Sequence, residues 1–385
     1  MESIYLDYNA TTPVHPAVLE RMLPYFSERF GNASSKLHRY GWQAEEAVKI
    51  AREQVSQLIQ SSPEEIVFSS GATESINLAI KGVVQAYSSK GKHIIALSTE
   101  HKAVLDTLEF LGSVGFEIEL LQVNRDGIPN LDELRSAIKP DTILVCAMLA
   151  NNETGVILPI EEISAIVHQK NSLLLCDATQ ACGKIPVDVN QMGIDLLALS
   201  AHKFYGPKGI GALYVRRKNP RVSLIPLLHG GQHESGIRSG TLNVPGIVGM
   251  GAAAEMFSTN PLLYAKHCLP LRLEIEKSLS AAGCKITAHS SERLPNTVHV
   301  EMPGIKADRL IPLVPELAFS TGSACSSALA APSHITLAMG FSEEESYASI
   351  RISLGIFNSI KEIQKAGSTI ITAYQKLCDG LHHAH

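Results

Sequence analysis

The sequence predicts an α/β fold built on a mainly parallel, buried β-sheet. Apolar strand-like runs alternate with amphipathic helix-like segments between about residues 20 and 255. A second observation is that candidate polar residues come directly after several of these runs. Because ligands of such sheets bind beyond the carboxyl ends of the strands, we expect these polar residues to form one site.

The expected elements follow this alternation in order. We predict strands at residues 66–68, 93–97, 142–149, 172–176, 194–199 and 210–215, with helices at 74–87, 102–111 and 160–169. After about residue 256 the pattern changes, and we predict a helix at 269–281, strands at 297–301 and 349–353, and a closing helix at 360–377. We therefore expect a large domain at residues 15–255 and a smaller α+β domain formed by residues 1–14 and 256–385.

Composition excludes several classes of function. The chain has 385 residues, a net charge of −5 and no long basic run, which argues against nucleic acid as the main partner. It has no apolar stretch of the roughly 20 uncharged residues that a membrane helix needs, and no signal peptide, so we expect no membrane association and a cytoplasmic protein. The seven cysteines contain no C-x-x-C pair, which predicts no metal site, and Cys146 and Cys176 lie in strand-like runs and should be buried.

Residues 200–209, Ser-Ala-His-Lys-Phe-Tyr-Gly-Pro-Lys-Gly, form an expected loop between two apolar runs. Burial there would lower the pKa of Lys203, and a neutral amine can form a Schiff base with an aldehyde. Ser200 and His202 offer donors for an anion such as a phosphate. Pyridoxal phosphate needs both an amine and phosphate donors, so it is the candidate cofactor. An exposed loop lysine with an ordinary charge is the alternative.

Two further strand ends suit the same ligand. Ala72 and Thr73 open a helix, where backbone amides and a hydroxyl favour a phosphate, although Thr73 alone is also ordinary helix capping. Asp177 ends a strand, and a buried carboxylate there needs a cation such as a protonated pyridine nitrogen. Gln180 is placed to donate to the phenolic oxygen of the ring. A helix-capping role for Asp177 remains open.

Three more residues are candidates for substrate contacts and proton transfer. His101 follows a strand and is placed to stack on a flat ring or to move protons. Asn152 offers amide donors at another strand end, and Arg351 alternates with apolar residues and suits a bidentate grip on a carboxylate. The alternatives are a structural histidine, a turn asparagine and a surface arginine.

Cys325 lies in Ser-Thr-Gly-Ser-Ala-Cys-Ser-Ser-Ala-Leu, a small and polar run that predicts a mobile surface loop. An exposed loop cysteine suits a nucleophile that collects a group in the site and carries it outward, whereas an incidental loop cysteine is the alternative. Residues 236–242 have the flexibility and donors to reach a phosphate, in this subunit or in a neighbouring one.

These motifs together are specific. The chain resembles group I cysteine desulfurases of the NifS/IscS type, in the class V branch of fold-type-I pyridoxal-phosphate enzymes, over nearly its whole length. The motifs that carry the resemblance are Tyr-Leu-Asp-Tyr-Asn-Ala-Thr-Thr at 5–12, Gly-Ala-Thr-Glu-Ser at 71–75, Asp-Ala-Thr-Gln at 177–180, Ser-Ala-His-Lys at 200–203, Arg-Ser-Gly-Thr at 238–241 and Arg-Ile-Ser-Leu-Gly at 351–355. Residues 328–332 and 355–358 depart from the usual pattern, which puts partner docking and loop behaviour in doubt.

The resemblance implies a role for each candidate residue. Lys203 would bind the cofactor aldehyde, Asp177 the pyridine nitrogen and Gln180 the ring oxygen. Thr73, Ser200 and His202 would hold the phosphate, joined by Thr241 from the second subunit of a homodimer, and His101 would stack on the ring. Asn152 and Arg351 would hold the substrate carboxylate, and Cys325 would be the nucleophile.

The implied reaction removes sulfur from L-cysteine, giving L-alanine and a persulfide on Cys325. The persulfide would pass to an acceptor protein, such as an iron–sulfur scaffold or a tRNA-thiolation relay. A selenocysteine lyase or a class V aminotransferase would share every cofactor residue, but an aminotransferase has no use for Cys325. A cofactor-free scaffold protein and a thiol hydrolase are alternatives from other classes, and the presence of Lys203, Asp177 and His101 argues against the scaffold.

Overall fold

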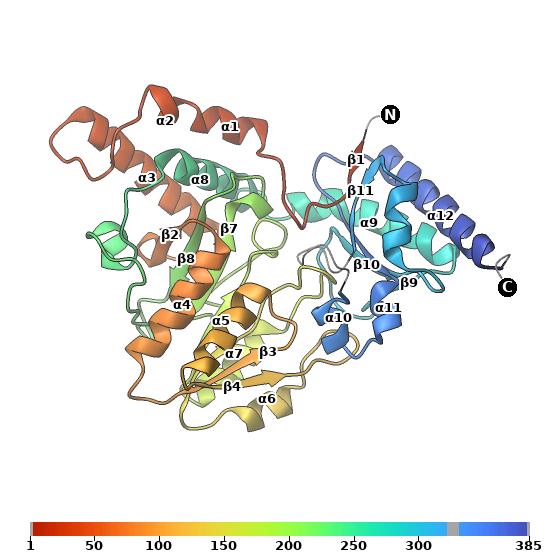
Figure 1. Cartoon of the computed structure of the whole chain (residues 1–385). Coiled ribbons are helices and arrows are strands. Elements are labelled where there is room, and N and C mark those ends of the chain that lie inside the picture. Colours follow the sequence, from red (N-terminus) through yellow and green to blue (C-terminus); the bar gives the residue numbers. More distant parts are fainter. Residues whose placement is uncertain (1–2, 322–330, 383–385) are drawn as a thin grey trace.

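A computed structural model of the chain describes residues 3–321 and 331–382. It confirms the predicted α/β class, because a seven-stranded and mainly parallel sheet forms the centre of the larger region (Figure 1). The strands in sheet order are β2 (Ile66–Ser69), β8 (Gly211–Val215), β7 (Leu196–Ser200), β6 (Leu173–Asp177), β5 (Thr142–Cys146), β3 (His93–Leu97) and β4 (Glu117–Leu121). Neighbouring strands are parallel from β7 to β4, whereas β8 is antiparallel to both β7 and β2.

The central strands form because they are continuous apolar runs that are buried on both faces. Alternate side chains enter different cores. Leu197 and Leu199 of β7 belong to one hydrophobic cluster, while Leu196 and Ala198 belong to another. A shift of one residue in register would exchange these two sets of side chains, so the pattern fixes how β7 pairs with β6 and β8.

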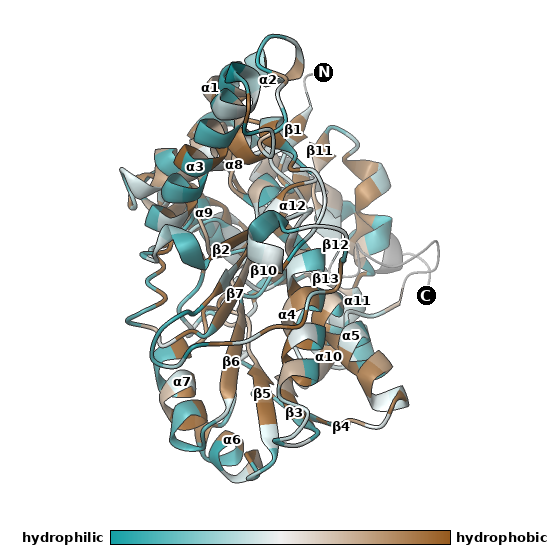
Figure 2. Cartoon of the chain, turned by 90° about the vertical axis from the view of Figure 1, so that its left-hand side faces the viewer, coloured by the Kyte–Doolittle hydropathy of each residue, from teal (hydrophilic) through white to brown (hydrophobic). Residues whose placement is uncertain are grey.

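Helices cover both faces of this sheet. α4 (Ala72–Ala86) and α5 (Lys102–Ser113) pack on one face, whereas α3 (Arg39–Leu58), α7 (Ile160–Gln169) and α8 (Val244–Ser258) pack on the other. The shorter helices are α1 (Pro16–Met22), α2 (Pro24–Ser27) and α6 (Leu131–Ala137). Figure 2 shows the brown, apolar strands enclosed by helices that carry teal, hydrophilic surfaces. Within the described residues, no helix is long and apolar enough to cross a membrane.

A smaller region is built around an antiparallel sheet of four strands. In sheet order they are β12 (Ser320–Thr321), β13 (Ser349–Ser353), β10 (Thr297–Glu301) and β9 (Lys285–Ile286). Next to this sheet, β1 (Ile4–Tyr5) pairs in parallel with β11 (Leu317–Ala318), which brings the start of the chain into this region. The remaining helices are α9 (Leu263–Ala281), α10 (His334–Ala338), α11 (Glu343–Tyr347) and α12 (Ile360–His382).

The boundaries of most predicted elements agree with the structure, but the strand predicted at 142–149 ends at Cys146. α9 begins at Leu263 rather than at residue 269, and it continues through Pro270. A proline is more usual in the first turn of a helix than in its interior, so the residues before Pro270 give a weak helix signal in the sequence. β4 was not predicted, since it is an edge strand whose burial is only partial and whose sequence contains two glutamates.

Candidate active site

A cavity of about 580 Å³ lies at the carboxyl ends of the parallel strands, and we call it the strand-end cavity. All of the predicted cofactor and substrate residues except Thr241 line it: Ala72, Thr73, His101, Asn152, Asp177, Gln180, Ser200, His202, Lys203 and Arg351. Thr241 is exposed and does not line the cavity in this single chain. Cys325 lies outside the described residues.

Lys203 ends a short 3₁₀ turn, η2 (Ala201–Lys203), which directly follows β7. Its half-buried Nζ donates to the carbonyl oxygens of Asn9 at 2.6 Å and Ala10 at 2.9 Å. The amine is therefore held at the cavity wall by backbone from the start of the chain, about 190 positions away in sequence. The interpretation of Lys203 as an exposed loop lysine is not supported by this position.

The end of the cavity beside α4 suits an anion. Gly71 is the N-cap of α4, and its φ of 152° favours glycine. Because no side chain caps this helix, the first backbone N–H groups of α4 point out of the helix start without an intrahelical partner. A Cβ built on Gly71 would lie 3.7 Å from Ser200 Oγ, so this hydroxyl is next to the helix start. The positive end of the helix dipole, Ser200 and the nearby Lys208 together favour a phosphate.

His202 belongs to the same end of the cavity. Its Nδ1 lies 3.1 Å from Thr11 Oγ1. Burial, followed by the charges of Lys203 and Lys208, lowers the pKa of His202 to about 4. The imidazole is therefore neutral at physiological pH, and it would contact an anion through a hydrogen bond rather than through a positive charge.

The site also has two carboxyl groups that lie near each other. Asp177 ends β6 and is buried, and its Oδ1 accepts a hydrogen bond from the Thr179 amide at 2.9 Å. Glu100 is completely buried beside it and accepts from the Met148 amide at 2.6 Å. Burial, and then the charge of Asp177, raises the pKa of Glu100 to about 8. Glu100 therefore holds a proton at neutral pH, and Asp177 provides a carboxylate to the cavity.

Arg351 is buried in β13 and directs its guanidinium into the cavity, so the alternative of a surface arginine is wrong. NH2 donates to Asp7 Oδ1 at 2.6 Å and to Ser320 Oγ at 3.1 Å, while NH1 donates to the Asn152 carbonyl oxygen at 3.2 Å. Arg351 Nε and Asn152 Oδ1 are both buried without a hydrogen-bond partner among the described residues. This end of the cavity thus retains polar groups that a ligand would satisfy.

His101 has a structural role as well as a place in the cavity. It is the N-cap of α5, where its Nδ1 accepts from the Ala103 amide at 3.1 Å. The same imidazole ring also lines the strand-end cavity. Capping fixes the orientation of the imidazole, which is a requirement for stacking on a planar ligand.

Sequence reasoning missed several residues of this site. The polar segment at 7–12 supplies Asp7, Asn9 and Thr11 to the cavity, and Glu100 lies next to the predicted His101. Segment 7–12 follows β1 of the smaller region, so the strand-and-helix alternation of the larger region did not point to it. Its concentration of small polar residues after an apolar pair was the available signal.

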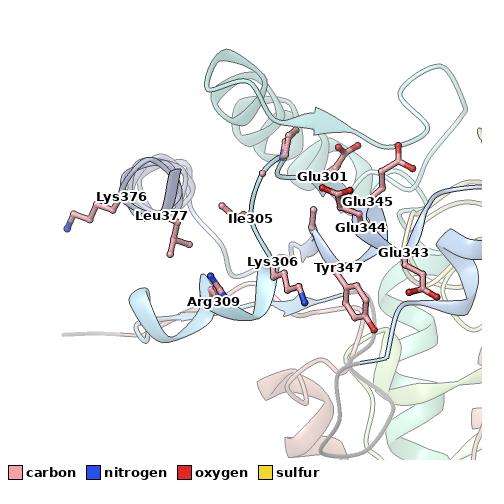
Figure 3. A pocket seen from close by; sticks show the side chains of 13 residues that line it. Glu301, Ile305, Lys306, Arg309, Glu343, Glu344, Glu345, Tyr347, Lys376 and Leu377 are labelled. Carbon is pink, nitrogen blue, oxygen red and sulfur yellow. The ribbon is translucent and has the colours of Figure 1, made fainter. Parts of the chain in front are cut away.

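A second and larger cavity, of about 1020 Å³, lies between α11, α12 and the segment after β10, and we call it the α11–α12 cavity. Figure 3 shows Glu301, Glu344 and Glu345 on one side and the cations Lys306, Arg309 and Lys376 on the other. Several of these charges already have partners: Lys285 pairs with Glu301 at 2.9 Å, and Arg125 pairs with Glu345. Of the predicted site residues that the structure describes, none lines this cavity.

The groups of the strand-end cavity fit pyridoxal phosphate. They include an amine for its aldehyde, a buried carboxylate for its ring nitrogen, and an uncapped helix start beside a hydroxyl for its phosphate. Thr179 Oγ1 and Asn152 Oδ1 are buried without partners among the described residues, as expected where a polar ligand completes the site.

The other cysteines are less suited than Cys325 to the role of nucleophile. Cys146 and Cys176 are buried, as predicted, and burial raises the pKa of each thiol well above its ordinary value. Cys182, Cys268 and Cys284 are buried as well, and Cys378 is half-buried.

Within residues 3–321 and 331–382, no group of three or more His, Cys, Asp or Glu side chains is arranged to hold a metal ion.

The comparisons with known proteins agree with one another. Residues 4–366 match the family described as Aminotransferase class-V. "Cysteine desulfurase IscS" of Anaeromyxobacter sp. (strain Fw109-5) is 50% identical over 376 residues, which are 97% of this chain and 93% of the relative. "Cysteine desulfurase IscS" of Neisseria meningitidis serogroup C / serotype 2a is 48% identical over 375 residues, 97% of this chain and 93% of the relative.

Solved structures are similar over nearly the whole fold. A "NIFS-LIKE PROTEIN" superposes with a TM-score of 0.89 at 38% identity, covering 98% of this chain and 99% of that chain. A structure entitled "SspA in complex with cysteine" superposes with a TM-score of 0.82 at 38% identity, covering 92% of this chain and 99% of that chain.

Proposed function

This chain belongs to the aminotransferase class-V family and, within it, to the cysteine desulfurases, and we propose that Lys203, Asp177 and Cys325 carry out its desulfuration of L-cysteine. The observation that supports this assignment best is the convergence of residues from six separate strand ends or loops on one cavity, with the Lys203 amine at its wall. We propose pyridoxal phosphate as the cofactor. When bound, it would supply an aldehyde and a ring that accepts electrons.

Different residues of the cavity would bind different parts of this cofactor. The first amides of α4, with Ser200 and His202, would hold the phosphate. Asp177 would pair with the ring nitrogen and keep it protonated, while Gln180 would donate to the ring oxygen. His101, fixed by its capping bond, would stack on the ring.

Substrate binding and proton transfer would fall to a second set of residues. Arg351 and Asn152 would hold the carboxylate of L-cysteine, so Asp7 would have to share the Arg351 guanidinium with the substrate. Lys203 Nζ would take the proton from the substrate Cα and return a proton to the product. Cys325 Sγ would attack the substrate sulfur, forming an S–S bond as the C–S bond breaks, and alanine would leave.

The assembly that we propose is a homodimer. Thr241 is exposed here, and the resemblance assigns it to the phosphate of the neighbouring subunit. Leu37, Tyr40 and Trp42 are large apolar side chains that are more than one third exposed, and Lys36 next to them lines a cavity together with residues 232–235 and Leu242. An exposed apolar area beside the Thr241 segment supports a self-association surface there. Light scattering after size exclusion would measure the molar mass.

We also propose that residues 15–255 form one domain and that residues 1–14 and 256–385 form the other. The separate hydrophobic cluster of the smaller region, which contains Ile4 and Leu6 together with side chains of β10, β13 and α12, supports this division. The persulfide on Cys325 would pass to an acceptor protein such as an iron–sulfur scaffold. A cytoplasmic location stays a prediction from the sequence.

The test is the absorption spectrum of the purified protein before and after addition of L-cysteine, with alanine and sulfide assayed. Wild-type protein should show a long-wavelength cofactor band and form alanine without an added keto acid. Lys203→Ala should lose this band and about a thousandfold or more of the activity, since the amine both binds and transfers a proton.

Cys325→Ser is the matched variant. It should keep the cofactor band, because the position does not belong to the cofactor-binding set, but it should no longer release sulfide from L-cysteine. Full sulfide release by Cys325→Ser, or an unchanged spectrum for Lys203→Ala, would contradict the assignment of the corresponding residue.

A further inference from the structure

We propose that Lys184 is a positioning residue for the cofactor site, which fixes the side-chain amide of Gln180 so that its N–H group faces the cavity. Lys184 does not line the cavity and is not one of the predicted site residues. It lies in the turn that follows β6, four positions after Gln180 and completely buried. This inference rests on the proposed function, because it assigns Gln180 to the oxygen-bearing edge of the cofactor ring.

The contacts of Lys184 are unusual for a lysine. Its Nζ donates to Gln180 Oε1 at 2.7 Å and to Asn9 Oδ1 at 2.9 Å, and both acceptors are amide oxygens rather than carboxylates. Burial, followed by the charge of Lys203, lowers the pKa of Lys184 well below its ordinary value. Lysine is rarely buried completely without a carboxylate partner, so this placement is costly and calls for a function.

The two amides gain a definite orientation from this lysine. An amide side chain has a donor end and an acceptor end of nearly equal size, so it can turn over unless its neighbours distinguish the two ends. Lys184 Nζ donates to the oxygen end of Gln180, and as an ammonium ion it has no lone pair with which to accept from the nitrogen end. The Gln180 Nε2 end is thereby turned toward Asn9, whose carbonyl oxygen it contacts at 2.9 Å.

That carbonyl oxygen connects Gln180 to the reactive amine. Asn9 O accepts from Gln180 Nε2 and also from Lys203 Nζ, so the amide nitrogen and the amine share one anchor at the cavity wall. Among the described residues, Asn9 O is the only recorded acceptor for Gln180 Nε2, although the amide nitrogen carries two hydrogens. The second N–H is available to the cavity, which Gln180 lines.

Lys184 also orients Asn9 in the same way. Asn9 Oδ1 accepts from Lys184 and from Asn296 Nδ2 at 3.1 Å, while Asn9 Nδ2 donates to Thr297 Oγ1 at 2.9 Å and to the Asn152 carbonyl oxygen at 3.2 Å. Removing Lys184 would take a donor from both amide oxygens at once. A reversed Gln180 would then present an oxygen to the electron-rich oxygen of the ring, which is unfavourable.

The experiment compares Lys184→Met with Gln180→Ala and with the double variant. Methionine has nearly the volume of lysine and no donor. With the cofactor bound, we measure the pH midpoint of its long-wavelength absorption. The Gln180 N–H group would stabilise the deprotonated ring oxygen, so without this donor the ring oxygen would hold its proton more tightly. Gln180→Ala and Lys184→Met should therefore each raise the pH midpoint of the absorption by about half a unit to one unit. The double variant should shift it no further than Gln180→Ala alone.

A second readout does not need the cofactor. In cofactor-free protein labelled with ¹⁵N at glutamine side chains, the Gln180 amide resonance is the one that Gln180→Ala removes. Lys184→Met should move or broaden this resonance. Ile185→Ala is the matched control, since Ile185 is the half-buried neighbour of Lys184, packs against the core and has no side-chain group that could form a hydrogen bond with Gln180 or Asn9. It should lower the melting temperature without changing the midpoint or the resonance.

The outcomes separate this inference from the proposed function. A Lys184→Met protein with an unchanged Gln180 resonance, or with a midpoint shift that adds fully to that of Gln180→Ala, would overturn the role of Lys184. An unchanged midpoint in Gln180→Ala would do the same, even if Lys184→Met fails to fold, because Lys184 would then have nothing to act through. A wild-type protein without a Lys203-dependent cofactor band would instead contradict the proposed function, while the resonance would still test Lys184.

Discussion

The strand-end cavity and the α11–α12 cavity differ in how their charged groups are satisfied. The larger α11–α12 cavity, of about 1020 Å³, is lined by carboxylates and cations that are exposed or already paired, such as Glu301 with Lys285. The strand-end cavity has only about 580 Å³, yet its lining includes buried polar atoms that have no hydrogen-bond partner among the described residues, and the buried Glu100, which holds a proton, lies beside Asp177 of that lining.

The difference teaches that volume alone does not identify a site of chemistry. Exposed ion pairs contribute little and are screened by salt, so the α11–α12 cavity has little capacity to alter the reactivity of a ligand. Buried groups beside Asp177 act at a lower effective dielectric constant, where each charge has a larger effect on a bound molecule. If this comparison is correct, substitutions of like chemistry should have unequal effects in the two cavities.

The largest difference between the two cavities is expected for their carboxylates. Asp177→Asn removes the negative charge that would keep the ring nitrogen protonated, so kcat/KM for L-cysteine should fall by about a hundredfold or more. Glu344→Gln removes a carboxylate from the α11–α12 cavity and should change kcat/KM by less than about twofold. Steady-state alanine formation measures both values. Equal effects of the two substitutions would remove the distinction between the cavities.

The regular alternation of strands and helices allowed several residues that line the strand-end cavity to be singled out from the sequence. Strands that end in polar residues pointed to Asp177 and Lys203, since parallel strands direct their carboxyl ends to one edge, whereas Asn152 lies beyond the end of β5 at Cys146. The same reasoning could not find Asp7 or Asn9, whose place depends on the pairing of β1 with β11, more than 300 positions away in sequence. Nor could it show that Lys184 is buried, because burial of a charged side chain depends on which groups surround it in three dimensions.

A smaller effect is expected from the arginines. Arg351→Lys keeps a charge but loses the planar arrangement of donors that contacts Asp7, Ser320 and Asn152. KM for L-cysteine should therefore rise by about tenfold, while kcat changes less, because the guanidinium would bind the substrate carboxylate in the ground state as well. Arg309→Lys at the exposed edge of the α11–α12 cavity should leave KM unchanged. A fall in kcat alone for Arg351→Lys would instead indicate a role limited to the transition state.

The smallest effect concerns stability and pH. Glu153 is buried and directly follows Asn152 of the cavity lining. It accepts a hydrogen bond from Ser333 Oγ at 2.5 Å, and burial raises its pKa from 4.5 to about 7, although Ser333 and Arg351 act in the opposite direction. Because the folded state holds this proton more tightly than the unfolded state, Glu153 contributes stability that is fully present below pH 4.5 and is lost as pH rises through about 7.

Glu153→Gln should remove this dependence while keeping a group that accepts the Ser333 hydrogen bond. Between pH 5 and pH 7, the free energy of unfolding of the wild type should fall relative to that of the variant by about 1 kcal/mol per pH unit. Urea unfolding of cofactor-free protein at several pH values measures this slope. Glu344→Gln should leave the slope as in the wild type, because this position is exposed to water in the folded chain. If Glu153→Gln has the same slope as the wild type, the pKa of the buried Glu153 carboxyl is no more perturbed than that of an exposed one. The contrast between the two cavities would then rest on Asp177 and Arg351 alone.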